Sequence, residues 1–183
     1  MKDPRIVKVA KNLVHYSTKV KKGDNVLIEF KDHWPLPLVH ALVDEIRSIG
    51  ARAFTIYHDT QLQRRSLQAA DDEWFEIMKE VDLLRMKKMQ AFIAINGRDN
   101  SYELADVPSE NMKKYMEKYA KPVHFEQRVK HTNWCIIAFP NPSYAQASSM
   151  STEAFENFYF NVCSLDYAKM NKACLLYTSP SPR

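Results

Sequence analysis

The stretch Asn25 to Phe30, which reads NVLIEF, decides the fold class of this chain. It is a short apolar run with β-branched residues, and it follows a Lys-Gly-Asp turn at residues 22–24. Such a run is typical of a strand that is buried on both faces. Three more runs have the same character: Arg52 to Tyr57 (RAFTIY), Ala91 to Ile95 (AFIAI) and Asn133 to Phe139 (NWCIIAF). The sequence therefore predicts four buried strands.

Helical patterns separate these strands. Asp3 and Pro4 are typical of an N-cap and a first helical residue, and Gly50 is typical of a helix end. Helices are predicted near residues 4–14, 38–49, 60–68, 71–84 and 110–131, the last with a break before Pro122, and after Pro142 and Ser151. Apolar strands that alternate with helices indicate an α/β fold. We expect a mostly parallel sheet of about four or five strands with helices on both faces.

Apolar stripes indicate which helix faces are buried. The predicted stripes are Trp74, Ile77, Met78, Val81 and Leu84; Met112, Tyr115, Met116 and Tyr119; and Phe155, Phe158 and Tyr159. Lysines 113, 114 and 118 lie off the second stripe. Interleaved basic and aromatic residues are also found at nucleic-acid contacts, but this spacing favours a solvated helix face.

The composition is that of an ordinary soluble domain. The chain has 183 residues, 45% hydrophobic and 26% charged, with a net charge of +4. The basic residues are interleaved with acidic ones, so we expect no nucleic-acid partner. No apolar run approaches the length of a membrane span, so we expect no membrane partner. The N-terminus lacks an apolar leader and the cysteines lack metal or CxxC spacing, which indicates a reducing, cytoplasmic location.

The histidines do not form a recognisable metal motif. His33 and His40 are seven residues apart across a proline-rich loop, and His124 and His131 are seven apart on a predicted helix. Neither pair gives an HExxH arrangement or a compact set of two histidines and a carboxylate. Cys135 lies in a predicted buried strand, where thiols are usually inert. We therefore assign no metal ligand and no catalytic residue within this chain.

Polar residues at two strand ends are the best site candidates. His58 and Asp59 follow the second predicted strand, and Asn96, Gly97 and Arg98 follow the third. Ligands of open α/β sheets bind at the carboxyl ends of the strands. Gly97 permits a close backbone approach, and Arg98 is suited to pairing with a carboxylate. The alternative is that both segments are plain turns. We name His58, Asp59, Asn96 and Arg98 as candidates for a substrate channel.

Several segments resemble one enzyme family. They are residues 150–167 (MSTEAFENFYFNVCSLDY), 139–147 (FPNPSYAQA), 1–6 (MKDPRI), 13–17 (LVHYS) and 22–28 (KGDNVLI). Together they closely resemble the aminopeptidase T/aminopeptidase S family of dimetal leucyl aminopeptidases. The resemblance extends from residue 1 to about residue 173.

This resemblance implies a function and a cofactor. Family members bind two divalent metal ions of the zinc or cobalt class, which activate water and polarise the scissile carbonyl of a peptide substrate. They are homodimers of about twice this length, with the metal ligands in the C-terminal half. The resemblance therefore implies that residues 1–173 are the N-terminal α/β domain of an aminopeptidase. We expect this fragment to bind no metal and to be inactive alone.

The last ten residues break the pattern. Residues 174–183 read CLLYTSPSPR and resemble the translation of a transposase sequencing adapter. The alternative is a natural Ser/Pro-rich disordered tail. We expect an artefact, so these residues are left out of the fold prediction.

Two other function classes stay open. One is a standalone α/β binding or interaction domain without catalysis. The other is a small α/β hydrolase or redox domain, against which three absences count: a G-x-S-x-G elbow, a CxxC pair and a glycine-rich loop. A gene that continues past residue 173 with metal-binding residues would favour the aminopeptidase.

Overall fold

Four parallel strands form one sheet in the computed structural model, which describes residues 3–165, 167, 169 and 170. They are β1 (Asn25–Lys31), β2 (Arg52–His58), β3 (Ala91–Asn96) and β4 (Asn133–Ala138). Their order is β2-β1-β3-β4, and every pairing is parallel. All four apolar runs are therefore strands, and the predicted parallel sheet is confirmed.

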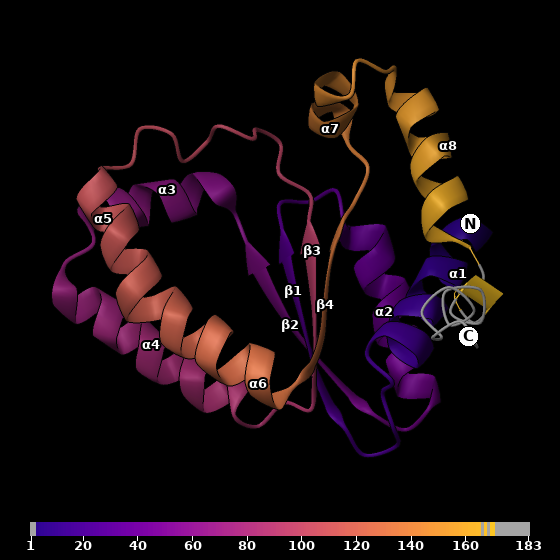
Figure 1. The fold of residues 1–183 in the computed structure, drawn as a ribbon, viewed down its shortest axis with the longest axis horizontal. Coiled ribbons are helices and arrows are strands. Elements are labelled where there is room, and N and C mark those ends of the chain that lie inside the picture. The colour runs from indigo at the N-terminus through magenta and orange to yellow at the C-terminus, as the bar shows by residue number, and fades with distance from the viewer. Residues whose placement is uncertain (1–2, 166, 168, 171–183) are drawn as a thin grey trace, which may run out of the picture.

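Helices cover both faces of this sheet (Figure 1). On one side lie α1 (Pro4–Lys11), the π-helical segment η1 (Asn12–Ser17), α2 (Leu36–Ser48) and α8 (Thr152–Cys163). On the other lie α3 (Thr60–Ala69), α4 (Asp72–Met86), α5 (Ser109–Lys114), the π-helical segment η2 (Tyr115–Arg128) and α6 (Val129–His131). The short helix α7 (Pro142–Ala147) follows β4. The α/β class with helices on both faces is confirmed.

The sheet separates two hydrophobic cores. Successive side chains of a strand point to opposite faces, so Val26 and Ile28 of β1 pack toward α1 and α2, whereas Leu27 packs toward α4 and η2. Both cores contain fully buried aliphatic and aromatic side chains, such as Leu42 in the first and Phe92 in the second. The strand β1 lies between β2 and β3, so it contributes to both cores along its whole length.

Polar caps fix where the helices begin and end. The Asp3 carboxylate accepts a hydrogen bond from the Arg5 backbone N–H at 2.8 Å, and Asp59 and Asp71 cap α3 and α4 in the same way. Gly50 follows α2 with a φ of 76°, a left-handed conformation that favours glycine at a helix end. These starts and stops agree with the sequence prediction.

The ion pairs of Arg5 connect the first and last described helices. Its guanidinium lies 2.8 Å from the Asp3 carboxylate and 2.7 Å from the Glu156 carboxylate of α8. It also lies over the ring of Phe160, 4.6 Å from the ring centroid. One arginine therefore joins the N-cap of α1 to α8 across 151 residues of sequence.

The predicted buried face of α4 is wrong in part. Ile77, Val81 and Leu84 are 56%, 53% and 62% exposed, whereas Phe75 is fully buried. The buried face also carries Asp82, whose carboxylate accepts a hydrogen bond from the Tyr119 hydroxyl at 2.8 Å. Because of this charged residue, the core-facing side looks less apolar in the sequence than the exposed stripe beside it, which explains the wrong prediction.

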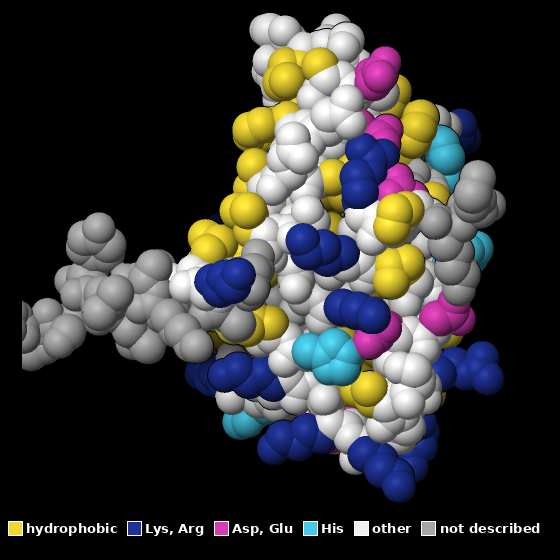
Figure 2. Space-filling view, turned by 90° about the vertical axis from the view of Figure 1, so that its right-hand side faces the viewer, with side chains coloured by type: hydrophobic (Ala, Val, Ile, Leu, Met, Phe, Trp, Pro, Cys, Tyr) yellow, Lys and Arg dark blue, Asp and Glu magenta, His cyan; other side chains and the backbone are white. Residues whose placement is uncertain are grey.

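Two other aromatic or methionine stripes need a similar correction. In η2, Tyr119 is buried but Met116 is exposed. In α8, Phe158 is exposed, and the buried pair is Tyr159 and Phe160, which pack against Phe139. Figure 2 shows hydrophobic side chains at the surface on the side of the molecule that carries α1, α2 and α8. Helical spacing found the stripes but assigned their orientation incorrectly.

The predicted break before Pro122 does not occur. The helix continues from α5 through η2 and α6 to His131, and Pro122 lies inside the π-helical part. A proline ring clashes with the carbonyl four residues earlier in an α-helix. The wider π turn, with its hydrogen bonds to the fifth residue back, gives the ring room.

The proposed adapter translation, residues 174–183, lies outside the described residues. Among the residues that the structure describes, no helix is both long enough and apolar enough to cross a membrane.

Replacement of Phe75 tests the corrected orientation of α4. We expect Phe75→Ala to lower the free energy of unfolding by about 3–5 kcal/mol, because it leaves a cavity in the second core. Leu84→Ala on the exposed face is the matched control and should cost less than about 0.5 kcal/mol. Urea unfolding followed by circular dichroism measures both. Similar losses for the two variants would contradict this orientation.

Candidate functional site

A cleft of about 280 Å³ lies at the carboxyl ends of β1 and β2. Helices α3 and α4 and the segment η2 form its outer wall. Polar side chains from the two strands lie on one side, and aromatic and aliphatic side chains from the helices lie on the other. This is where open α/β sheets bind ligands.

The alternation of β1 brings two charged side chains into this cleft. Leu27, Glu29 and Lys31 lie on the same face of the strand. Leu27 belongs to the second core, and Glu29 and Lys31 continue the row into the cleft. The apolar run of β1 thus becomes polar on one face as it reaches its carboxyl end.

The Glu29 carboxylate is largely buried and is paired with His58. Its side chain is 15% exposed, and its Oε1 atom lies 3.4 Å from Nε2 of His58 on β2. Burial alone raises the pKa of Glu29, but the contact with His58 and the charges of His124 and Lys31 outweigh burial and lower it. Glu29 is therefore a buried anion near neutral pH.

Lys31 and Arg98 lie in a shared electrostatic environment. Burial lowers the pKa of Lys31, and the positive charge of Arg98 lowers it further, whereas Glu29 and Asp32 act in the opposite direction. Arg98 also acts on Tyr115, which lines the cleft. Among the described residues, neither side chain has an ion-pair partner, and the Nε atom of Arg98 is buried without a hydrogen bond. Glu29 and Asp32 are therefore the carboxylates that favour the Lys31 cation, although neither forms an ion pair with it.

Tyrosines form the wall opposite the charged strand residues. The rings of Tyr115 and Tyr119 lie 5.3 Å apart between centroids. Burial raises the pKa of Tyr115 to about 12 and also raises the pKa of Tyr119, so both hydroxyls stay protonated at neutral pH. Leu67, Trp74 and Met78 extend this wall with apolar surface.

A buried aspartate holds the surrounding loops together. Asp32 follows β1, with a φ of 56°. Its carboxylate accepts hydrogen bonds from the backbone N–H of Thr60 at 2.8 Å, the hydroxyl of Thr60, and the backbone N–H of Asp99 at 3.1 Å. One carboxylate thus ties the start of α3 and the loop after β3 to the end of β1.

Gly97 allows the loop after β3 to pass close to its neighbours. A Cβ atom at this position would lie 2.4 Å from Cδ of Pro35 and 3.0 Å from the carbonyl oxygen of Lys31. The close approach expected from the sequence therefore exists within the chain itself. It places Arg98 beside the end of β1.

The structure brings together some of the predicted channel residues. His58 and Asp59 both line the cleft, and Asp59 also caps α3. Arg98 is electrostatically coupled to Lys31, and its carbonyl accepts a hydrogen bond from Asn141 at 2.8 Å. Asn96 ends β3 and is not among the described residues that line the cleft. Their role in a substrate channel stays a prediction.

Sequence reasoning missed the two charged residues of β1. In the sequence, Glu29 lies within an apolar run and Lys31 directly follows it. Their spacing of two residues in a strand predicted to be buried on both faces was the available signal, because it places both charges on one face. Tyr115 and Tyr119 were assigned to a core stripe, and they also line the cleft.

The other candidate residues do not converge on a metal site. His33 is exposed and lies 3.8 Å from Asp99, whereas His124 packs against Phe92 and Tyr119. Burial raises the pKa of Cys135 to about 12, which makes its thiol a poor ligand at neutral pH. Among residues 3–165, 167, 169 and 170, no group of three or more His, Cys, Asp or Glu side chains could hold a metal ion.

A comparison with protein families decides the assignment. The family described as thermophilic metalloprotease (M29) matches residues 2–173. The chain belongs to the M29 metalloprotease family. The resemblance to aminopeptidases that the sequence showed is therefore confirmed at the level of the family.

The M29 fold is also found in a solved structure. Wild-type AmpT from Thermus thermophilus matches with a TM-score of 0.65 and 21% identity over 88% of this chain. The match covers 43% of AmpT, so this chain spans less than half of that protein's length. An alcohol dehydrogenase superfamily protein from Novosphingobium aromaticivorans gives a TM-score of 0.36 with 13% identity over 87% of this chain and 48% of its own. A comparison with curated proteins gives no significant match.

An M29 metalloprotease requires a divalent metal, and the described residues do not fit one. The carboxylate and histidine nearest each other in the cleft, Glu29 and His58, lack a third ligand among the described residues. No metal-dependent step is therefore assigned to side chains of this part of the chain.

The partly buried ring of His124 should make stability depend on pH. Burial lowers the pKa of His124 below its ordinary value of 6.5. The unfolded chain therefore takes up a proton below about pH 6.5 that the folded chain does not, and stability falls as the pH falls through this range. We expect His124→Phe to lose less stability between pH 7 and pH 5 than the parent chain.

Thermal unfolding at pH 7 and pH 5 measures this difference. Lys130→Met, on the exposed surface of α6, is the control and should keep the acid dependence of the parent chain. An unchanged acid dependence in His124→Phe would show that this ring does not contribute.

Proposed function

We propose that this chain supplies the α/β domain of a metal-dependent aminopeptidase that removes N-terminal residues from peptides. The family match over residues 2–173 carries this proposal. The metal pair, of the zinc or cobalt class, is held by residues outside the described part, in which no suitable ligand group occurs. We expect the chain alone to be inactive and activity to need further residues, an expectation that the coverage of only 43% of AmpT supports.

The domain's contribution is to bind and orient peptide. The cleft at the carboxyl ends of β1 and β2 offers buried charges beside an aromatic wall. His58, Asp59, Asn96 and Arg98 border the path of the peptide, and Asp32 holds their loops in place. This assignment gives these residues roles in substrate binding and none in bond cleavage.

The full-length enzyme is proposed to be a cytoplasmic homodimer. The family resemblance supports the dimer. Cys135 and Cys163 are free thiols, which supports a reducing compartment. Light scattering of the full-length protein that gave a monomer mass would contradict the dimer.

The central experiment compares two lengths of the protein. Hydrolysis of leucine-p-nitroanilide is measured with added cobalt or zinc for the 183-residue chain and for a chain continued past residue 173 to the natural stop codon of its gene. We expect activity only in the longer protein, because only that protein would hold the metal pair. Removal of the metal with a chelator should abolish this activity.

Three outcomes would count against the proposal. Activity of the 183-residue chain would mean that a metal site has been overlooked. Inactivity of a folded, metal-loaded longer protein on all peptide substrates would favour a binding domain. A natural stop codon directly after residue 173 would do the same.

Arg98 separates a binding role from a chemical role. In the longer protein, Arg98→Ala should raise KM more than it lowers kcat, because its guanidinium contributes to binding and does not take part in cleavage. Lys130→Met, at the opposite end of the sheet, is the control and should change neither constant. Kinetics of Arg98→Ala that equal those of the parent enzyme would remove Arg98 from the channel.

A further inference from the structure

The outer edge of β4 is unpaired and uncharged. Among the described residues, β4 pairs with β3 alone, and the backbone N–H groups of Asn133 and Phe139 donate to carbonyl groups on the β3 side. Alternation then directs the N–H and C=O groups of residues 134, 136 and 138 outward. Charged or polar side chains usually protect such an edge, as the exposed Arg52 and Thr55 do on β2. The strand β4 has no charged residue.

Large apolar side chains are exposed along this edge. Trp134 is 40% exposed and Ile136 is 51% exposed. They lie in register with Phe92 and Ala94 of β3, which belong to the second core. The two exposed side chains therefore lie on the sheet face that α4 and η2 cover, at the point where this cover ends.

The neighbouring helix adds to this apolar surface. Tyr119 contacts α4, whereas His124 and Arg128 pack on β3. Phe125 and Val129 follow these last two by one residue, so they lie on the flank of the helix away from α4, and both are exposed. Figure 1 shows the end of this helix beside the start of β4. The β4 shelf is the apolar surface formed by Phe125, Val129, Trp134 and Ile136.

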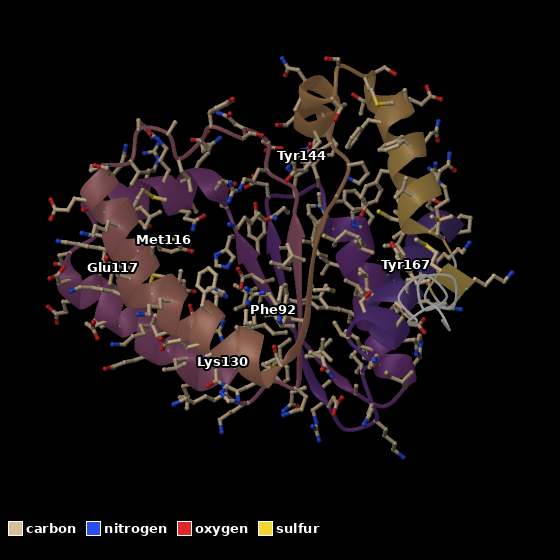
Figure 3. The ribbon with its side chains drawn as sticks, viewed as in Figure 1. Phe92, Met116, Glu117, Lys130, Tyr144 and Tyr167 are labelled. Carbon is tan, nitrogen blue, oxygen red and sulfur yellow. The ribbon has the colours of Figure 1, made fainter. Side chains whose placement is uncertain are left out.

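A buried arginine without a hydrogen-bond partner borders the β4 shelf. Arg128 is 6% exposed, and its guanidinium lies 5.0 Å from the ring centroid of Phe92 and 4.7 Å from that of Trp134. Phe92 lies between the sheet and the helix (Figure 3). The Nε and Nη1 atoms of Arg128 are buried and have no hydrogen bond among the described residues. Buried donors are nearly always hydrogen-bonded in folded proteins, so an acceptor is expected from outside these residues.

The order of the strands limits where a neighbour of β4 can come from. The connection from β1 to β2 crosses on the side of α2 and moves toward one edge of the sheet, whereas those to β3 and β4 cross on the side of α4 and η2 and move toward the other. A parallel strand outside β4 directly after α8 would move toward the β4 edge but cross on the side of α2, which is the opposite hand. Parallel crossovers have one hand in about 98% of cases. The segment directly after α8 is therefore excluded as a parallel neighbour.

We propose that the outer edge of β4 pairs with a strand from a later part of the same polypeptide, which places apolar side chains on the β4 shelf and a carboxylate beside Arg128. The match with AmpT covers 43% of that protein, so such a relative has the further length of chain that this pairing requires. The buried positive charge of Arg128 favours an acidic residue in the strand. The choice of the same polypeptide as the source rests on the proposed function.

Amide hydrogen exchange at residue resolution tests this pairing. It compares the 183-residue chain with the longer protein of the activity assay. The amides of residues 134, 136 and 138 should exchange at least about ten-fold more slowly in the longer protein, because they are hydrogen-bonded and covered there. The amides of Cys135 and Ile137, which point toward β3, are the internal control and should be protected in both proteins.

Two results would overturn the proposal. One is equal exchange of residues 134, 136 and 138 in the short and the longer protein. The other is protection of these amides in the short chain that increases with its concentration, which would assign the edge to a second copy of the chain.

A proline at the edge blocks the pairing selectively. Ile136→Pro removes one outward N–H group and leaves the hydrogen bonds to β3 in place, a position at which sheets tolerate proline. In the longer protein it should return the amides of Trp134 and Ala138 to the exchange rates of the short chain. Thr55→Pro, at an outward position of β2, is the matched control and should leave them protected. Retained protection in Ile136→Pro would contradict the pairing, and Ile136→Lys gives the same test if the proline variant fails to fold.

Arg128 tests the charge of the incoming strand. In the longer protein, Arg128→Met should speed exchange at residues 134 and 136 by about ten-fold, because the carboxylate loses its partner. Arg128→Lys keeps the positive charge and should retain most of the protection. Equal protection in Arg128→Met and the parent protein would remove the carboxylate from the proposal.

The result is separable from the aminopeptidase assay. Protected edge amides in a longer protein that hydrolyses no peptide would keep the pairing and refute the proposed function. Freely exchanging edge amides in an active longer protein would keep the function and refute the pairing.

Discussion

The central position of β1 is the constraint on which the rest of the structure depends. Because β1 lies between β2 and β3 and is covered by helices on both faces, its side chains must suit two different cores in alternation. Val26, Ile28 and Phe30 meet this requirement on one face to the end of the strand. On the other face the row changes from Leu27 to Glu29 and Lys31, and the core opens into the cleft at that point.

Burial of charge at this strand end has a cost that the surrounding residues offset. Desolvation acts against the charged forms of both Glu29 and Lys31. His58, from the neighbouring strand, stabilises the Glu29 anion, whereas Arg98 opposes the Lys31 cation. Glu29 and Asp32 favour the Lys31 cation, and Lys31 in turn favours the Glu29 anion, so the opposite charges at this strand end support each other.

The sequence predicted the framework well because the signals that specify it are local. Four apolar runs, the caps at Asp3 and Asp59, and the turn at Gly50 all act within a few residues of where they occur. The orientation of α4 could not be predicted in this way, because Asp82 is acceptable inside only through its contact with Tyr119, 37 residues away. The helix through Pro122 likewise depends on π-helical winding, which residue spacing does not reveal.

The candidate site was only half predictable for the same reason. His58 and Asp59, which line the cleft, could be named from the sequence because strand ends in α/β proteins are common sites, whereas Glu29 and Lys31 lie one step earlier, inside β1. A charged residue within an apolar strand is expensive to bury and persists only where neighbours or a ligand stabilise it. Glu29 has such a neighbour in His58, and Lys31 has no ion-pair partner among the described residues. Alternation places the two on one face, so Lys31 lines the same cleft as Glu29, and the charges of Glu29 and Asp32 favour its cation there.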